Sequence, residues 1–495
     1  MPLERLELPE PRPIPGTVRA AVGEGNVLSG AEDRVRRAAG RSYPDLIRLR
    51  SGRLERAPDA VLVPADAAKV AAVLHACSEA GVAVVPFGGG SSVVGGLDAV
   101  AGDHAAVVSL DLGRLRSVDL DRTSLVARLG PGLRGPEAEA ALGERGTTLG
   151  HYPQSYEQAT IGGYAATRSA GQASSGYGRF DELVTAVELT APAGVLRTLQ
   201  IPHTAAGPSL RELVLGSEGT LGVITEVACR VRPAPELRRY EGWIAPDFAS
   251  GREIVRELAQ RQEMPDVLRL SDEEETSVSM QLSGTEGWQK RALDAYLSLR
   301  RRRGGCLIVC GYEGERGSVR RRRSLASRRL RSGGAVALGQ TAGRSWEKAR
   351  FEGPYLRDEL IGIGVFVETL ETAHTWSRLD ELYLAVGGAL RDALGPRSIV
   401  MCHLSHAYPD GASLYYTFLA RARRGEELEQ WRDAKRAASD AIVAVAGTIT
   451  HHHAVGRDHA PYMRNEVGEL GLEALRAVKE RLDPAGIMNP GKLLP

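Results

Sequence analysis

Apolar and polar positions alternate regularly between residues 58 and 130. Residues 60–65, AVLVPA, predict a short strand, and residues 66–81 predict a helix that begins at an acidic residue and ends at glycine. Residues 82–90, VAVVPFGGG, predict a buried strand that enters a glycine turn. This order predicts a β-α-β unit, which is followed by two more strands in AVVSLDL and TSLVARLGPG and a helix in GPEAEAALGERG.

The second half of the chain has a different pattern. Glycine is dense from residue 150 onward, and Pro233 and Pro235 mark a predicted domain boundary. Beyond it, helical spacing at 252–263, 286–303 and 318–332 alternates with strand-like runs. These runs are CLIVCGYEG, VFVETLE and SLYYTFLAR. We therefore expect an α+β fold whose second part is built on an antiparallel sheet.

Composition narrows the function classes. The 495 residues are 43% apolar, enough for two or three structural units, and 63 basic against 62 acidic side chains give no reason to expect a nucleic-acid partner. Five scattered cysteines do not suggest disulfides. No secretory leader or membrane span is apparent, so we expect a soluble, cytoplasmic protein, with a shallow membrane contact left open. The arginine-rich segment 320–334 predicts a solvated helix face, with lipid or nucleic-acid contact as the alternative.

Three glycine-rich segments carry candidate chemistry. VVPFGGGSSVVGG, residues 84–96, follows an apolar strand, so that successive backbone N–H groups can converge on a phosphate. The segment matches neither a P-loop nor the GxGxxG fingerprint, and taken alone a tight structural turn explains it equally well. The second segment covers residues 151–178, and the third, GSEGTLGVITEV, covers residues 216–227.

In order and spacing, PFGGGSS, TIGGYAATRSAG, GSEGTLGVITE and the C-terminal LDPAGIMNPGKLL resemble the FAD enzymes of the vanillyl-alcohol-oxidase/p-cresol-methylhydroxylase family. The resemblance implies a two-subdomain FAD-binding domain and an α+β cap domain with an antiparallel sheet. The implied division is an N-terminal segment at 1–53, the FAD domain at 54–234, the cap at 235–450 and a returning C-terminal segment at 451–495. Because PFGGGSS contains neither His nor Cys, we expect non-covalent FAD.

By this resemblance, three groups of residues line the FAD. They are Pro86, Phe87, Gly88, Gly89, Gly90, Ser91 and Ser92; Gln154, Ser155, Tyr156, Glu157, Gln158, Ala159 and Thr160 with Thr167, Arg168, Ser169 and Ala170; and Glu218, Gly219, Thr220, Leu221, Gly222, Val223 and Ile224.

Four further segments narrow the resemblance. VLRLSDEEE, PYLRDELIGIGVFVETLETAHTWSRL, GASLYYTF and GTITHHHAVG resemble the alkyldihydroxyacetonephosphate synthases, and the similarity runs from about residue 43 onward. It implies that Tyr415 is the active-site acid/base, that Arg357 binds substrate and that Arg269 is needed for activity. The run His451, His452 and His453 matches a histidine triplet of that family. One departure is His403, where those enzymes have arginine.

The resemblance also implies a reaction. Such an enzyme exchanges the acyl chain of 1-acyl-dihydroxyacetone phosphate for a fatty alcohol without net oxidation, through an adduct at flavin N5. It implies small lipid substrates and a homodimer. Two alternatives stay open: an FAD-dependent dehydrogenase of a 2-hydroxy acid such as D-lactate or glycolate, and a catalytically silent lipid- or anion-binding protein.

A metal centre is not expected. Many relatives that oxidise 2-hydroxy acids have a second metal-binding histidine where this chain has Tyr415, and a phenol of pKa about 10 is a poor ligand at neutral pH. The phenol can instead carry a proton if neighbouring cations lower its pKa. Without the resemblance, a tyrosine in SLYYTF would be ordinary strand packing, and alternation places Tyr415 and Tyr416 on opposite faces.

The other polar candidates are less specific. GTIT predicts a strand leading into the histidine run, so that His451 and His453 share a face unless a turn intervenes. Glu368 and Glu371 could form a carboxylate pair, although a structural or solvated role is favoured. His403 and His406 line a cavity or belong to a strand, with neither favoured, and His459 is expected to have no special role.

Overall fold

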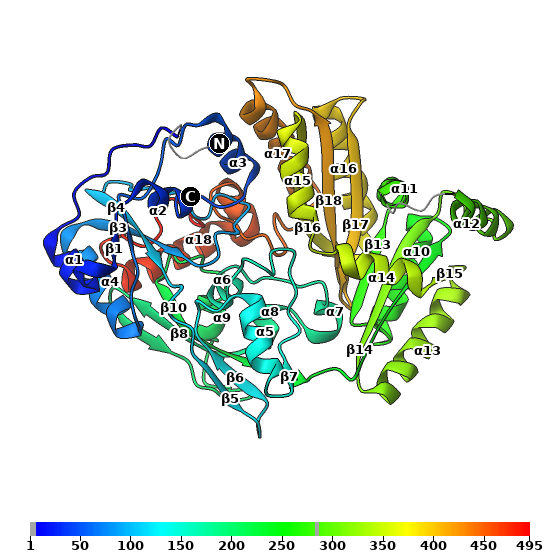
Figure 1. Cartoon of the computed structure of the whole chain (residues 1–495), viewed down its shortest axis with the longest axis horizontal. Helices are drawn as coiled ribbons and strands as arrows, with labels where there is room; N and C mark the ends of the chain where they lie inside the picture. The colour runs from blue at the N-terminus through cyan, green and yellow to red at the C-terminus, as the bar shows by residue number, and fades with distance from the viewer. Residues whose placement is uncertain (1–5, 283–286) are drawn as a thin grey trace.

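The computed structural model describes residues 6–282 and 287–495, which form an elongated molecule of α+β architecture (Figure 1). Four sheets organise these residues. Two sheets and the small β7–β11 pair belong to the first 233 residues, and a seven-stranded sheet lies beside them. The α+β expectation is confirmed.

The first sheet has the order β1-β2-β4-β3, and β4 is parallel to both β2 and β3. Helix α4 connects β2 to β3; the Asp66 side chain accepts from the Lys69 N–H at its start, and Gly81 ends it with a φ of +60°. The predicted β-α-β unit is therefore confirmed. The elements of this region are α1 (Gly16–Val22), η2 (Glu24–Asn26), β1 (Val27–Leu28), α2 (Ala31–Arg36), α3 (Tyr43–Ser51), β2 (Ala60–Leu62), α4 (Ala67–Ala80), β3 (Val82–Phe87) and β4 (Ala106–Asp111).

The second sheet has the antiparallel order β5-β6-β10-β8-β9. Its apolar face packs against short helices, among which α6 and α8 contribute Ile161 and Phe180 to the core. The elements are β5 (Val118–Asp121), β6 (Val126–Leu129), α5 (Gly135–Gly143), β7 (Thr147–Thr148), α6 (Ile161–Ala166), α7 (Ser174–Tyr177), α8 (Phe180–Leu183), β8 (Val184–Ala191), β9 (Gly194–Arg197), α9 (Leu210–Val214), β10 (Val223–Arg230) and β11 (Arg232–Pro233).

The seven-stranded sheet has the order β15-β12-β14-β13-β17-β18-β16, with every neighbouring pair antiparallel. Its strands are β12 (Leu237–Ala245), β13 (Val267–Ser271), β14 (Cys306–Gly314), β15 (Val336–Gly339), β16 (Val365–Thr375), β17 (Ile399–Ala407) and β18 (Gly411–Arg421). The helices around it are α10 (Phe248–Gln260), α11 (Glu273–Leu282), α12 (Gly287–Leu299), α13 (Arg316–Ser332), α14 (Gln340–Ala349), α15 (Gly353–Gly362), η3 (Trp376–Arg378), α16 (Leu379–Leu394) and α17 (Glu427–Ala444).

One face of this sheet forms the largest apolar core. Helices α10, α13, α16 and α17 bury their apolar stripes against it, and Leu270, Leu404 and Tyr416 point into it. Because side chains alternate along a strand, the odd-numbered residues beside them point to the opposite face. The sheet therefore has one apolar face, which forms the core, and one face that can hold polar groups.

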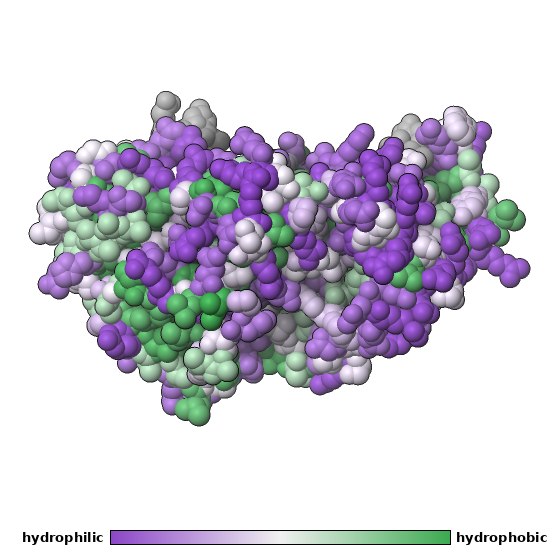
Figure 2. Space-filling model, turned by 90° about the horizontal axis from the view of Figure 1, so that it is seen from below, coloured by the Kyte–Doolittle hydropathy of each residue, from purple (hydrophilic) through white to green (hydrophobic). Residues whose placement is uncertain are grey.

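The arginine-rich segment forms helix α13. Leu330 is fully buried, while Arg322 and Arg323 pair with Asp266 and Glu241. The predicted solvated helix face is thus confirmed, with part of its charge neutralised by the sheet. Seen from below, hydrophilic side chains dominate the half of the molecule that carries this sheet, and apolar residues gather on the other half (Figure 2).

The C-terminal segment returns to the first two sheets. It contains η4 (Ala460–Tyr462) and α18 (Met463–Leu482). Met488 forms a bridge with Val84 in β3, and Leu482 packs against the core of the second sheet. Among the described residues, no helix is both long and apolar enough to cross a bilayer.

Candidate active site

A single row of residues crosses four strands of the seven-stranded sheet. Ser271 of β13 lies opposite His403 of β17, which lies opposite Tyr415 of β18, which lies opposite Glu371 of β16. Directly paired residues share a face of a sheet, about 5 Å from one another. The pairing therefore places these side chains together on the polar face.

The row contacts a buried ion pair. His403 Nδ1 lies 3.0 Å from Glu275 Oε1, and Arg269 donates to the same oxygen at 2.7 Å. Although burial raises the pKa of Glu275, Arg269 and His403 outweigh it and hold that pKa well below its usual range. Among the described contacts, Arg269 is therefore connected to Tyr415 indirectly: Arg269 binds Glu275, Glu275 contacts His403, and His403 stacks on Tyr415.

Tyr415 is the centre of the row. Its ring stacks on His403 with centroids 4.8 Å apart, and His452 and His453 lie at 6.1 Å and 5.4 Å. Burial raises the pKa of its phenol, and the hydrogen bond with Thr369 and the charge of Arg357 only partly offset this. The condition of a pKa lowered by neighbouring cations is therefore not met, because burial dominates. Tyr415 holds its proton at neutral pH.

The opposite-face prediction for the next residue is confirmed. Tyr416 is 1% exposed in the apolar core, where its hydroxyl donates to the carbonyl of Tyr383 at 3.0 Å. Two adjacent tyrosines thus have different environments.

The histidine run is a loop, and the predicted strand leading into it is wrong. After a single bridge between Thr448 and Ala373, the chain turns so that three successive N–H groups, those of His451, His452 and His453, meet the Glu371 carboxylate at 2.6, 3.0 and 2.8 Å. In an extended strand successive N–H groups point in alternate directions, so they could not share one carboxylate.

Glu371 is the anchor of this loop. Its carboxylate also accepts the hydroxyl of Thr450 at 2.7 Å and is fully buried. Burial raises its pKa, but the three imidazoles and the backbone N–H groups lower it well below the usual range. The favoured structural role of Glu371 is confirmed, and it is a specific one. Glu368 instead accepts the Trp431 indole N–H at 2.9 Å, so the two acids serve different partners.

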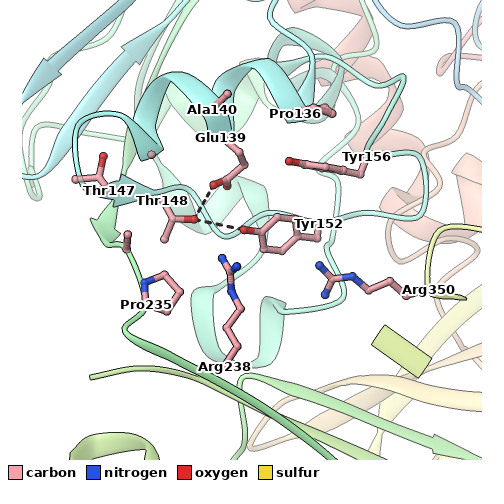
Figure 3. A pocket seen from close by; sticks show the side chains of 12 residues that line it. Pro136, Glu139, Ala140, Thr147, Thr148, Tyr152, Tyr156, Pro235, Arg238 and Arg350 are labelled. Atoms are coloured by element: carbon pink, nitrogen blue, oxygen red, sulfur yellow. Dashed lines mark hydrogen bonds between the residues drawn. The ribbon is translucent and has the colours of Figure 1, made fainter. Parts of the chain in front are cut away.

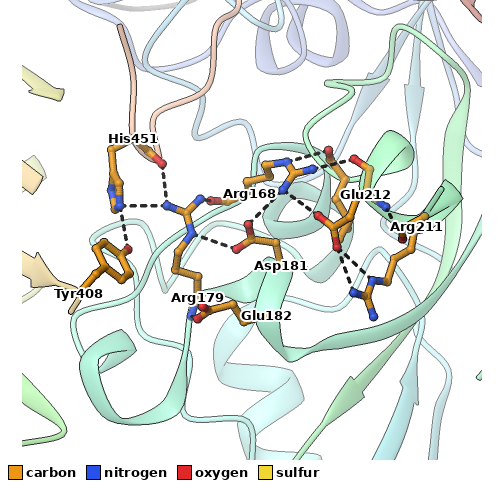
Figure 4. A network of polar contacts seen from close by, with 10 residues as sticks. Arg168, Arg179, Asp181, Glu182, Arg211, Glu212, Tyr408 and His451 are labelled. Carbon is orange, nitrogen blue, oxygen red and sulfur yellow. Dashed lines mark hydrogen bonds and ion pairs between the residues drawn. The ribbon is translucent and has the colours of Figure 1, made fainter. Parts of the chain in front are cut away.

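His451 joins the two halves of the molecule (Figure 4). Its Nε2 lies 2.9 Å from an N–H of Arg179, which precedes α8, and 2.8 Å from the hydroxyl of Tyr408, which follows β17. Its Nδ1 lies 3.1 Å from Nδ1 of His452. Burial lowers the pKa values of His406, His451, His452 and His453, so these imidazoles are neutral at physiological pH.

Three histidines lie close enough to form a metal-binding group. His406, His451 and His452 each offer a ring nitrogen, and these atoms all lie within 4.8 Å of one another. His406 belongs to β17, as the strand alternative expected, and its ring stacks on His451 with centroids 5.2 Å apart. The absence of a metal remains a prediction. His459 is buried outside this group, with Nδ1 3.0 Å from the carbonyl of Ala454.

Arg357 reaches the site from α15. One of its terminal nitrogens donates to the carbonyl of Arg41 at 2.8 Å, and its buried Nε has no partner among the described residues. Its charge lowers the pKa values of both Tyr415 and His453, which places it beside the row. A buried guanidinium nitrogen without a partner is suited to an anionic ligand.

The glycine loop that follows β3 fits a phosphate. In the described part of the chain, the backbone N–H groups of Gly88, Gly89, Gly90 and Ser91 have no acceptor. A Cβ on Gly88 would lie 2.4 Å from Thr160 Oγ1, and one on Gly89 would lie 1.9 Å from the carbonyl oxygen of Gln158. The first two predicted FAD segments therefore touch, with free donors between them, as a pyrophosphate site requires.

The side chains of two predicted FAD residues, Glu218 and Arg168, bind neighbouring parts of the protein. Glu218 accepts the N–H groups of Val455 and Gly456, both at 2.8 Å, and so ties the third segment to the histidine loop. The guanidinium of Arg168 is bonded to Leu215, Glu212 and Asp181. The side chains of Glu218 and Arg168 therefore connect segments of the protein that surround the site.

A cavity of about 420 Å³ lies apart from the row, between α5 and the start of β12 (Figure 3). Arg238, Arg350 and Tyr152 line it, and Tyr156 of the predicted FAD segment forms part of its wall. No residue of the row lines it, so we do not assign the chemistry to it.

The comparisons with known proteins agree with this geometry. Residues 58–200 match the family described as "FAD binding domain", and residues 234–493 match "FAD linked oxidases, C-terminal domain". The chain is 31% identical over 473 residues to the alkyldihydroxyacetonephosphate synthase of Dictyostelium discoideum, covering 93% of this chain and 77% of that one. It is 30% identical to the Trypanosoma brucei brucei synthase, covering 99% and 82%. The chain belongs to the alkyldihydroxyacetonephosphate synthase family.

The structures agree as well. A solved alkyldihydroxyacetonephosphate synthase superimposes with a TM-score of 0.86 at 28% identity, covering 99% of this chain and 88% of that one. The p-cresol methylhydroxylase structure, at 15% identity and a TM-score of 0.70, confirms the expected fold type. This member of the synthase family is an FAD-dependent enzyme. The glycolate oxidase subunit GlcD of Bacillus subtilis is more distant, at 26% identity over 88% of this chain.

Sequence reasoning missed several members of the site. Arg179, Tyr408 and Glu275 had no signal that separated them from ordinary polar residues. Glu371 was considered for a carboxylate pair or a structural role, but no local signal indicated that it binds the histidine run.

Proposed function

We propose that this protein exchanges the acyl chain of 1-acyl-dihydroxyacetone phosphate for a fatty alcohol, with no net oxidation. The observation that carries the proposal is the meeting of Tyr415 and the histidine run on one face of the sheet, with the partnerless Nε of Arg357 near enough for its charge to act on Tyr415 and His453. Bound FAD would supply an electrophilic ring that accepts the electron pair of the deprotonated substrate.

The buried residues divide the proton transfers between them. Burial keeps the imidazole of His453 unprotonated, so it can accept the C1 proton next to the ketone. Tyr415 holds its proton, so it can protonate the departing carboxylate. The resulting phenolate, stabilised by Arg357, takes the proton of the incoming alcohol. The imidazolium then returns its proton to C1, so both side chains regain their starting states.

Arg357 and the glycine loop bind anions at two different places. The loop donors serve the pyrophosphate of FAD, and Arg357 serves the phosphate or the leaving carboxylate of the substrate. PFGGGSS contains neither histidine nor cysteine, so FAD is bound without a covalent link and is released into solution when the protein is denatured.

The deciding experiment uses the yellow holoprotein with 1-acyl-dihydroxyacetone phosphate and labelled hexadecanol. We expect labelled alkyl product and one fatty acid released for each alcohol consumed, with no product when the acyl substrate is omitted. Full FAD occupancy with no alkyl product would sink the proposal. Anaerobic bleaching of the flavin by D-lactate or glycolate would favour the dehydrogenase alternative instead.

We also propose that the holoprotein contacts anionic membranes through α12. Helix α13, the earlier candidate, has part of its arginine charge paired with acids, whereas α12 leaves Trp288 75% and Leu299 82% exposed. Lys290, Arg291, Arg300 and Arg301 flank these apolar groups. Exposed apolar side chains among cations suit the interface of an anionic bilayer. The end of the molecule with α12 and α13 is otherwise hydrophilic (Figure 2).

Vesicle flotation tests this contact. We expect salt-sensitive binding to phosphatidylserine vesicles and weak binding to phosphatidylcholine vesicles, with a clear loss in W288A/L299A. Leu384→Ala, which removes an exposed leucine elsewhere, is the matched control. Binding that is unchanged in the double variant would rule out α12. The expected homodimer stays a prediction, which light scattering can test.

A further inference from the structure

Arg179 lies outside the predicted catalytic set, yet it contacts the histidine run directly. It comes from the FAD-binding part of the chain and crosses to the returning C-terminal segment (Figure 4). One nitrogen of its guanidinium donates to Nε2 of His451 at 2.9 Å and to the carbonyl of His451 at 3.0 Å. Asp181 accepts from its Nε at 3.0 Å, and the carbonyl of Arg168 accepts from its remaining nitrogen at 3.1 Å. The guanidinium is therefore held in one orientation from four directions.

This contact decides which nitrogen of His451 carries the proton. A guanidinium has five N–H donors and no acceptor, so the nitrogen of His451 that faces it must present a lone pair. Neutral imidazole carries one proton, which for His451 must then reside on Nδ1. Free histidine favours the other tautomer, so the protein imposes this one.

The tautomer of His451 also determines the tautomer of His452. Nδ1 of His451 lies 3.1 Å from Nδ1 of His452. Because the proton between them belongs to His451, Nδ1 of His452 accepts it. The proton of neutral His452 is then on Nε2, which has no protein partner among the described residues. The side chain of His452 keeps 13% of its surface exposed, so it is not sealed in the core.

We infer that Arg179 is a positioning residue that fixes the tautomers of His451 and His452, so that His452 offers Nε2–H as a neutral hydrogen-bond donor to an anionic group of the substrate. The His452 ring donates this hydrogen bond in its neutral form, because burial lowers the pKa of His452. The catalytic part of this inference rests on the proposed function, whereas the tautomers are a property of the resting holoenzyme.

Other charged and titratable groups face the same rings, and none of them reverses the assignment. They are Glu371 from β16, His406 and Tyr408 from β17 and its end, and His453 from the run itself. Glu371 accepts backbone N–H groups of the run, and its nearest approach to Nδ1 of His452 is 3.5 Å. The Tyr408 hydroxyl also faces Nε2 of His451, but the single lone pair of that nitrogen is engaged by Arg179, so the hydroxyl can accept an Nε2 proton only when the guanidinium is removed.

Nitrogen NMR of the ¹⁵N-histidine holoenzyme, measured without substrate, tests the tautomers. Comparison with His451→Asn and His452→Asn assigns the signals among the 11 histidines. We expect pyridine-type Nε2 and pyrrole-type Nδ1 for His451, and the reverse for His452. Arg179→Met should convert Nε2 of His451 to the pyrrole type, and Arg179→Lys, which keeps a donor, should preserve the parent pattern.

Turnover tests the role in catalysis. We expect Arg179→Met to lower kcat by about 10-fold to 100-fold with unchanged FAD occupancy, as is typical when a hydrogen-bonded supporting partner is lost. Arg211→Met is the matched control, because Arg211 pairs with Glu212 in the same polar network and does not touch a histidine. It should leave both the spectrum and kcat unchanged.

The outcomes separate the two proposals. A protonated Nε2 on His451 in the parent enzyme overturns the inference even if the methionine variant fails to fold. An unchanged spectrum or an unchanged kcat in a folded Arg179→Met enzyme overturns it as well. The assigned tautomers in a parent enzyme that makes no alkyl product would leave the positioning geometry intact and remove only the proposed function.

Discussion

The ring of His403 lies almost parallel to the ring of Tyr415, with centroids 4.8 Å and planes 18° apart. The stack covers one face of the phenol, and His453 approaches the same ring edge-on. These two ring contacts restrict the orientation of the phenol on the polar face of the sheet. Catalysis by proton transfer requires this kind of restriction, because the transfer distance is short.

Tyr415→Phe should lower kcat for alkyl transfer by roughly 10²-fold to 10⁴-fold, the usual cost of losing a general acid or base. FAD absorbance should be unchanged, since the phenol is not among the predicted cofactor ligands. Tyr416→Phe is the matched control on the opposite face. It should keep kcat and lose only about 1 kcal/mol of unfolding free energy, for its bond to Tyr383. Equal activity of the two variants would contradict the assignment.

Arg357→Ala should raise KM for 1-acyl-dihydroxyacetone phosphate by about 10-fold to 100-fold, because a charged hydrogen bond to an anion contributes roughly 1.5–3 kcal/mol. Arg357→Lys should recover only part of this, since it lacks the planar pair of donors. Arg50→Ala removes a neighbouring arginine that bonds the carbonyl of Asp358 on the same helix, and it should leave KM unchanged. Steady-state kinetics with both substrates varied will distinguish these results.

Glu371→Gln should weaken the fold and change its pH dependence. The folded pKa of Glu371 is depressed, so its contribution is complete above the ordinary carboxyl pKa near 4.5 and is lost as pH falls below that value. Urea unfolding should show that the parent loses stability faster than Glu371→Gln between about pH 5 and pH 3.5. At neutral pH the variant should be about 1–3 kcal/mol less stable, because an amide cannot accept all the N–H groups of the run. Glu429→Gln, an exposed acid on α17, should reproduce the parent.

Arg269→Met should destabilise the protein by about 3–5 kcal/mol, the range for removing one partner of a buried ion pair. The variant leaves the fully buried Glu275 with His403 as its partner. The Arg269 charge also lowers the pKa of His403, which burial already depresses, so this pKa should rise in the variant. Denaturant unfolding measures the first effect, and histidine NMR titration measures the second. A stable variant with an unshifted His403 would show that the pair is unimportant.

Chelators should not reduce activity, and the purified enzyme should contain much less than one equivalent of metal by elemental analysis. His406, His451 and His452 are close enough to hold an ion, but Nε2 of His451 already faces Arg179 and Nδ1 forms a bond with His452. A bound divalent ion would have to displace these contacts beside a guanidinium charge. One tightly bound metal per chain, with activity lost on its removal, would contradict this prediction.

Local pattern was sufficient for most individual elements. Strands such as β3 and β18 alternate or concentrate apolar residues, and α4 carries a capping acid and a terminal glycine within its own segment. The arginine-rich helix was also placed correctly, because Leu330 marks its buried stripe. These features depend on neighbours within a few residues, which a sequence displays directly.

The histidine run shows where local pattern fails. Its conformation depends on Glu371, 80 residues earlier, and β-branched residues in GTIT favoured a strand that this long-range contact overrides. The row of Ser271, His403, Tyr415 and Glu371 depends on strand pairings between residues 132, 12 and 44 positions apart, which no periodicity reveals. The resemblance supplied Tyr415, Arg357 and the triplet, but it did not show what supports them.

The row itself has a consequence for how such enzymes diversify. The spacing between its members is set by main-chain hydrogen bonds, which every amino acid except proline can make, so most substitutions in the row alter the reactive group without altering the framework that presents it. Selection can therefore exchange one reaction for another by single point changes. The sheet acts as a fixed template, and the chemistry is a property of the few side chains mounted on it.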